Sequence, residues 1–103
     1  MYKNGKKDGF WQIKIGNNIE KGYYINGIKE GQWITYDKDN NEIEKGSYTN
    51  GEKNGLWVIV TPENTIETGE YKNGKKTGVW DIYDFNENYM HSLNYPIIYP
   101  DVE

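Results

Sequence analysis

The sequence predicts an all-β protein built from tandem antiparallel β-hairpins that form one elongated, twisted meander sheet with a C-terminal cap. The main observation is a ten-residue pattern, Y-x-N-G-x-K-x-G-x-W, that occurs four times without a gap, at residues 2–11, 24–33, 48–57 and 71–80. Six fixed positions held over four copies identify a repeat protein. The tyrosines are 22, 24 and 23 residues apart, whereas Tyr and Trp are always nine apart, so length varies only between hairpins.

The Asn-Gly pair in each copy indicates a two-residue hairpin turn. Both central residues of a type I′ turn take a positive φ, which Asn tolerates and Gly adopts freely. When residues are counted outward from the turn, Tyr is paired with Lys, Gly with Gly and Glu with Trp in all three complete hairpins. The expected pairs are Tyr24–Lys29, Gly22–Gly31 and Glu20–Trp33; Tyr48–Lys53, Gly46–Gly55 and Glu44–Trp57; and Tyr71–Lys76, Gly69–Gly78 and Glu67–Trp80.

Glycine facing glycine leaves bare backbone on the sheet, which we expect the neighbouring Tyr and Trp rings to cover. Without such cover, each glycine in a strand interior costs about 1 kcal/mol relative to Ala. We interpret the aromatics as a packed ladder that holds the sheet; a row of ligand-stacking sites is the alternative. The predicted structural residues are Gly22, Tyr24, Gly31, Trp33, Gly46, Tyr48, Gly55, Trp57, Gly69, Tyr71, Gly78 and Trp80.

The sequence predicts a single domain, with four repeats in residues 1–85, of which the first is truncated, and a capping tail in residues 86–103. The expected strands are 11–15, 19–25, 28–36, 42–49, 52–60, 66–72, 75–85 and 89–95, separated by polar or Gly-rich turns. Residues 96–100 are apolar and bracketed by two prolines. We expect the tail to cover the last sheet edge, as repeat proteins require, with a partner-binding arm as the alternative.

Composition limits the class of protein. Only 35% of the 103 residues are hydrophobic, but 16% are aromatic, which argues against a disordered chain. There is no Cys, the repeat already includes Tyr2, and no apolar run approaches the length of a membrane span. We expect a soluble, cytoplasmic protein without a signal peptide.

The residue types argue against an enzyme, a cofactor or a metal site. His91 is the only His, and the adjacent Ser92 points to the opposite face of a strand. Residues 37–41 begin like a calcium loop but lack its later Gly and Glu. The recurring Glu20, Glu44 and Glu67 are expected to bond a nearby Lys or Tyr hydroxyl. The absence of Arg and the net charge of −4 argue against nucleic-acid binding.

The charge is unevenly distributed along the chain. Residues 1–29 carry a net +4, whereas residues 81–103 carry five acids and no Lys. Such asymmetry steers association with charged partners, although an ordinary solvated surface is the alternative. The candidate partner-binding residues are Asp81, Tyr83, Asp84, Glu87, Tyr89, Tyr99 and Asp101, the acids complementing a basic cleft and the tyrosines acting as anchors.

The repeated pattern, preceded by Gly22, Gly46 and Gly69 two residues before the later tyrosines, resembles the MORN repeat. It looks closest to the bacterial variant in YwqK-like antitoxin proteins and covers about residues 2–83. The resemblance implies tandem hairpins in one elongated sheet and neutralisation of a toxin protein; no functional residues carry over. We expect an antitoxin or immunity protein, with a scaffold or self-associating module, or a glycan-binding or cell-wall-binding repeat, as alternatives.

Overall fold

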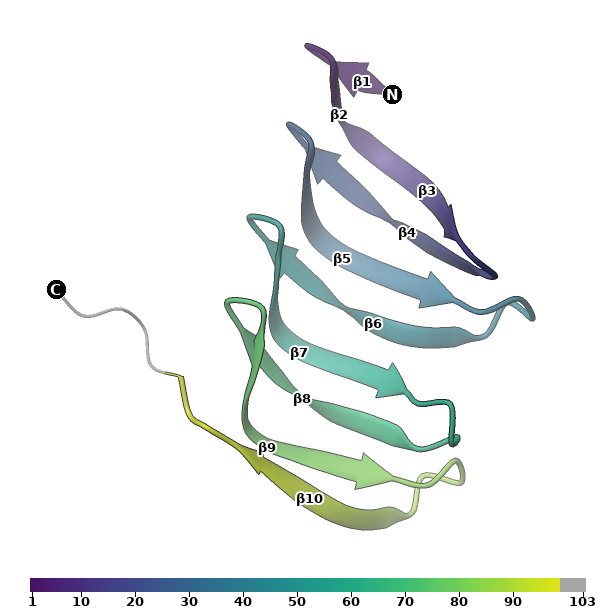
Figure 1. Cartoon of the computed structure of the whole chain (residues 1–103), viewed down its shortest axis with the longest axis vertical. Coiled ribbons are helices and arrows are strands. Elements are labelled where there is room, and N and C mark those ends of the chain that lie inside the picture. Colours follow the sequence, from purple (N-terminus) through teal and green to yellow (C-terminus); the bar gives the residue numbers. More distant parts are fainter. Residues whose placement is uncertain (99–103) are drawn as a thin grey trace, which may run out of the picture.

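The computed structural model describes residues 1–98, in which all regular secondary structure is β-strand. The strands are β1 (Tyr2–Lys3), β2 (Lys6–Lys7), β3 (Gly9–Ile15), β4 (Asn18–Ile25), β5 (Ile28–Tyr36), β6 (Glu42–Thr49), β7 (Glu52–Val60), β8 (Ile66–Lys72), β9 (Lys75–Tyr83) and β10 (Tyr89–Tyr95). Strands β3 to β10 form one open antiparallel meander in sequence order, and β1 pairs only with β2 (Figure 1). The predicted all-β meander is confirmed.

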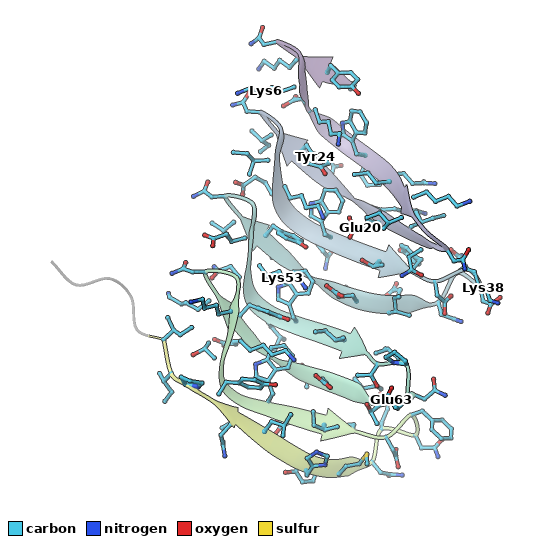
Figure 2. The ribbon with its side chains drawn as sticks, viewed as in Figure 1. Lys6, Glu20, Tyr24, Lys38, Lys53 and Glu63 are labelled. Carbon is cyan, nitrogen blue, oxygen red and sulfur yellow. The ribbon has the colours of Figure 1, made fainter. Side chains whose placement is uncertain are left out.

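The two ends of the strands use different turns. At one end, all four Asn-Gly pairs have positive φ, for example 52° at Asn26 and 81° at Gly27, as a type I′ turn requires. At the other end, the Asp37 carboxylate accepts hydrogen bonds from the backbone N–H of Asp39 and Asn41, both at 2.9 Å. Figure 2 places Lys6 at the Asn-Gly tips and Lys38 and Glu63 at the opposite ends of the strands.

The predicted register holds only between the turn and the first glycine. Tyr24 faces Lys29 as expected, and the equivalent pairs form in the next two hairpins. The predicted Gly–Gly pairs (Gly22–Gly31, Gly46–Gly55, Gly69–Gly78) and Glu–Trp pairs (Glu20–Trp33, Glu44–Trp57, Glu67–Trp80) are wrong. Instead Glu20 faces Thr35, Glu44 faces Ile59 and Glu67 faces Ile82, each two residues farther along.

A bulge beside the second glycine of each hairpin causes this shift. Gly31 has a φ of 72°, in the left-handed region that side chains disfavour, and the three residues from Gly31 to Trp33 stand opposite Gly22 alone. Gly55 and Gly78 have φ values of 81° and 72° and start the same bulge in the next two hairpins. The second glycine therefore provides backbone freedom, not a partner for the first.

The bulge lays each Trp ring directly on the first glycine. A Cβ atom at Gly46 would overlap the ring of Trp57, and the same holds for Gly22 with Trp33 and for Gly69 with Trp80. The Trp57 indole Nε1–H also donates to the Ser47 carbonyl at 3.1 Å. Exposed fractions of 3%, 2% and 0% for the three tryptophans make these rings the centre of the core.

The rings continue into a ladder that crosses the whole sheet. Tyr and Trp alternate in edge-to-face contacts with centroids 5.1 to 6.3 Å apart, each contact adding about 0.5–1.5 kcal/mol beyond simple burial. The contacts join Tyr2, Trp11, Tyr24, Trp33, Tyr48, Trp57, Tyr71, Trp80 and Tyr95 in that order. We call the side of the sheet that carries this ladder the tryptophan face and the other side the outer face.

The packing of ring on glycine predicts the effect of one methyl group. Gly46→Ala is expected to lower the free energy of unfolding by about 1–3 kcal/mol, because the Trp57 ring must move away from the strand. Urea unfolding followed by Trp fluorescence measures this. Ser47→Ala, on the exposed outer side of the same strand, is the matched control and should change stability by less than about 0.5 kcal/mol. Equal stability of the two variants would contradict the packing described.

Candidate functional site

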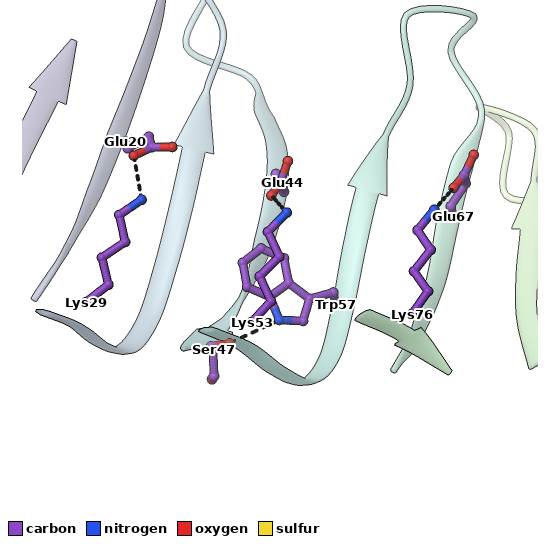
Figure 3. A network of polar contacts seen from close by, with 8 residues as sticks. All are labelled: Glu20, Lys29, Glu44, Ser47, Lys53, Trp57, Glu67 and Lys76. Atoms are coloured by element: carbon purple, nitrogen blue, oxygen red, sulfur yellow. Dashed lines mark hydrogen bonds and ion pairs between the residues drawn. The ribbon is translucent and has the colours of Figure 1, made fainter. Parts of the chain in front are cut away.

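The tryptophan face is filled by side chains of the chain itself. Lys29, Lys53 and Lys76 reach Glu20, Glu44 and Glu67 with Nζ–Oε1 distances of 2.9, 2.7 and 3.2 Å (Figure 3). Each ammonium group also lies over two rings; that of Lys53 is 4.8 Å from the Trp57 centroid and 5.0 Å from that of Tyr71. The expectation that the recurring glutamates bond a lysine is confirmed. These carboxylates bind the ammonium groups that lie over the rings of the ladder.

These contacts raise the pKa values of the three lysines. Burial by itself would lower the pKa of Lys53, but the hydrogen bond to Glu44 and the charge of that carboxylate outweigh it, so the pKa lies above 10.5. The pKa values of Lys29 and Lys76 are raised by the same balance. Folding therefore favours the charged form of each lysine. This contribution to stability is complete at pH values below the pKa of the lysine in the unfolded chain, and it is lost as the pH rises through the pKa of the lysine in the folded protein.

The outer face presents apolar side chains to solvent near its C-terminal end. Leu56 on β7 is 66% exposed and Val79 on β9 is 59% exposed. They line an open groove of about 650 Å³ whose wall also includes Ile97 and Ile98. Thr77 holds this wall, since its hydroxyl donates to the Pro96 carbonyl at 3.0 Å and accepts from the Ile98 N–H at 2.8 Å.

Acidic residues lie around this groove. Glu70 and Asp81 line it together with Lys72. A neighbouring groove, lined by Val58, Ile66, Thr68, Tyr83 and Glu87, shares Thr68 with the first. The two grooves therefore form one surface across β7 to β9, which we call the acidic groove surface and define by Leu56, Val58, Thr68, Glu70, Val79, Asp81, Tyr83, Glu87 and Ile97.

The structure brings together four of the residues predicted to bind a partner. The rings of Tyr83 and Tyr89 meet edge to face at 5.9 Å, and the Tyr89 hydroxyl lies 2.6 Å from the Ser92 hydroxyl. Ser92 in turn donates to the Asp81 carboxylate at 2.8 Å. Glu87 lies in the turn between β9 and β10 and lines the second groove.

The other three predicted residues do not contribute in the same way. The Asp84 carboxylate accepts hydrogen bonds from the backbone N–H of Asn86 and Asn88, both at 2.9 Å, so it shapes its own turn. Tyr99 and Asp101 lie outside the described residues.

Sequence reasoning missed the apolar half of this surface. Leu56 and Val79 each directly precede a ladder tryptophan, so alternation along the strand sends them to the outer face. The same position holds Phe10 and Gln32 in the other two copies of the pattern. The apolar residues at this position in the last two copies of the pattern are the sequence signal that indicates the apolar half of the surface.

Comparison of the sequence with models of known protein families and with curated protein sequences finds no match. Among residues 1–98, no helix has the length and apolar character needed to cross a membrane. In the same part of the chain, no three or more His, Asp or Glu side chains gather in a way that could hold a metal ion. The resemblance to the MORN repeat remains a prediction.

The raised pKa of Lys53 predicts a pH dependence of stability. At neutral pH, wild-type protein should be more stable than Glu44→Gln by about 0.5–1 kcal/mol, because the carboxylate attracts the charged ammonium of Lys53 and the neutral amide does not. The difference should disappear as pH rises above 10.5. Thermal unfolding across this range measures it. Glu42→Gln, which removes an exposed acid from the same strand, is the control; a pH-independent difference for Glu44→Gln would contradict this account.

Proposed function

We propose that the protein is an antitoxin or immunity protein that binds a cognate bacterial toxin domain and blocks its active site by contact, in the cytoplasm and without catalysis. The acidic groove surface carries the proposal. It combines exposed apolar side chains with acidic residues on one face of a sheet, whereas the tryptophan face is used for internal packing.

The apolar part of the surface suits a protein partner. Single exposed apolar residues are ordinary, but Leu56, Val79 and Ile97, each more than half exposed, gather around one groove. A partner side chain that enters this groove would be removed from water on several sides. Such enclosed positions supply most of the binding energy in protein interfaces.

The acidic part of the surface suits a basic partner. Glu70, Asp81 and Glu87 lie along the two grooves, and Lys72 is the basic residue on the wall of the first. If the toxin is a nuclease with a basic substrate cleft, these acids supply complementary charge. Complementary charge accelerates association and suppresses binding to wrong partners.

A scaffold or self-associating module is the second candidate. The observation that favours it is the open sheet, in which β3 and β10 are edges whose backbone groups face outward. A glycan-binding or cell-wall-binding repeat is less well supported. Trp33, Trp57 and Trp80 are at most 3% exposed and offer no face on which a sugar could stack.

Coexpression with the product of the neighbouring gene tests the proposal. That product should be toxic alone and harmless together with this protein. A double variant, Leu56→Lys and Val79→Lys, should lose protection and weaken binding by about 2 kcal/mol or more, roughly thirtyfold.

Ile25→Lys is the matched control, because Ile25 is a similarly exposed apolar residue, 55% exposed, but lies on β4, away from the acidic groove surface. It should protect as well as the wild type, and thermal unfolding should find both variants folded. A neighbouring product that is harmless alone, or still toxic beside the wild-type protein, rejects the antitoxin function. Full protection by the double variant rejects the location of the site.

A further inference from the structure

The hairpin tips are tied to one another by backbone hydrogen bonds. Gly27 N–H donates to the Lys7 carbonyl at 2.8 Å, so the second tip is held by the first hairpin. In the same way, Gly51 N–H donates to Lys29 at 3.1 Å and Gly74 N–H donates to Lys53 at 2.9 Å. We call this contact, from the glycine of one tip to the preceding hairpin, the tip clasp.

Two of the clasped tips have a second bond to the preceding hairpin. The Asn50 N–H donates to the Glu30 carboxylate at 2.8 Å, and the Asn26 N–H donates to the Asp8 carboxylate at 3.3 Å. Asn73 is held through the Gly74 bond. The tips at Asn26 and Asn50 are therefore tied twice and the tip at Asn73 once.

The first tip, Asn4-Gly5, lacks the clasp. Among residues 1–98, no acceptor meets the Gly5 N–H, whereas the other three tip glycines each donate to the hairpin before them. Its strands form only two residue pairs, outside the eight-stranded sheet. Weakly held elements of this kind open locally at a small cost in free energy. Asn4 and Asn73 are both exposed, so exposure does not distinguish them.

We propose that Asn4 is a site of spontaneous deamidation and that the tip clasp protects the other three Asn-Gly turns. The Gly5 backbone nitrogen attacks Cγ of the Asn4 side chain, and its proton leaves with the side-chain nitrogen as ammonia. The resulting succinimide ring is opened by water at either carbonyl, which yields aspartate or isoaspartate. One water is consumed and one ammonia released, and no oxidant or reductant takes part.

The clasp acts on the attacking atom. In the folded turn the glycine N–H points to the preceding hairpin, and the left-handed Asn conformation must change before the ring can close. Both changes require the tip to detach from its neighbour. The rate at each site therefore follows the population of the open tip, which is largest at Asn4.

The chain contains its own matched comparison. Asn4 and Asn73 lie in identical tetrapeptides, Lys-Asn-Gly-Lys, at residues 3–6 and 72–75. We expect peptide mapping by mass spectrometry, after incubation of the folded protein in mildly alkaline buffer, to find Asn4 converted roughly tenfold faster than Asn73. In denaturing urea the two sites should react at equal rates. Equal rates in the folded protein, or a difference that persists in urea, would overturn the proposal.

A reciprocal pair of variants tests the side-chain bonds. Glu30→Ala should accelerate deamidation at Asn50 and leave Asn26 unchanged, whereas Asp8→Ala should do the opposite. Each variant is thus the control for the other, and both leave the backbone carbonyls of the clasp in place. If both variants changed both sites equally, general destabilisation would explain the rates and protection by individual tip contacts would be rejected.

Discussion

The stacking of a tryptophan ring on bare glycine backbone is the interaction on which the rest of this structure depends. A single-layered sheet has no second layer to bury its side chains, and among residues 1–98 the buried hydrophobic residues are Tyr24, Trp33, Trp57, Trp80 and Ile82. Close approach of ring to backbone requires a glycine without Cβ below the ring and a second glycine with positive φ to form the bulge. The two glycines and the tryptophan of each repeat therefore act as one unit.

The same geometry explains how the ladder ends. Trp33 and Trp57 each lie on the first glycine of their own hairpin and pair in register with the first glycine of the next hairpin, as Trp33 does with Gly46. On the last strand the residue opposite Trp80 is Leu93. Tyr95 still completes the ring contacts, but Leu93 stands at the position where the earlier hairpins have a glycine that receives a Trp ring. The sheet thus uses one face for cohesion, leaving the outer face available for a partner.

The sequence was sufficient to predict the elements but not how they fit together. The strands Glu42–Thr49, Glu52–Val60 and Ile66–Lys72 have the predicted bounds, because the Asn-Gly turns and the fixed spacing locate them. The predicted register beyond the first glycine was wrong, because the two glycines of a hairpin have different roles that the sequence does not distinguish. Gly22 lies under a Trp ring, whereas Gly31 has a positive φ and forms the bulge. The acidic half of the candidate surface was visible as a charge run. The apolar half required knowledge of which residues share a face.

The most direct measurement of the central claim is the proton NMR spectrum of the glycines under the rings. Protons that lie against the face of an indole are shielded by its ring current. The packing of ring on glycine predicts strongly upfield-shifted Hα resonances for Gly22, Gly46 and Gly69, with nuclear Overhauser contacts to Trp33, Trp57 and Trp80 respectively, and ordinary shifts for Gly31, Gly55 and Gly78. Ordinary Hα shifts at Gly22, Gly46 and Gly69 would contradict it.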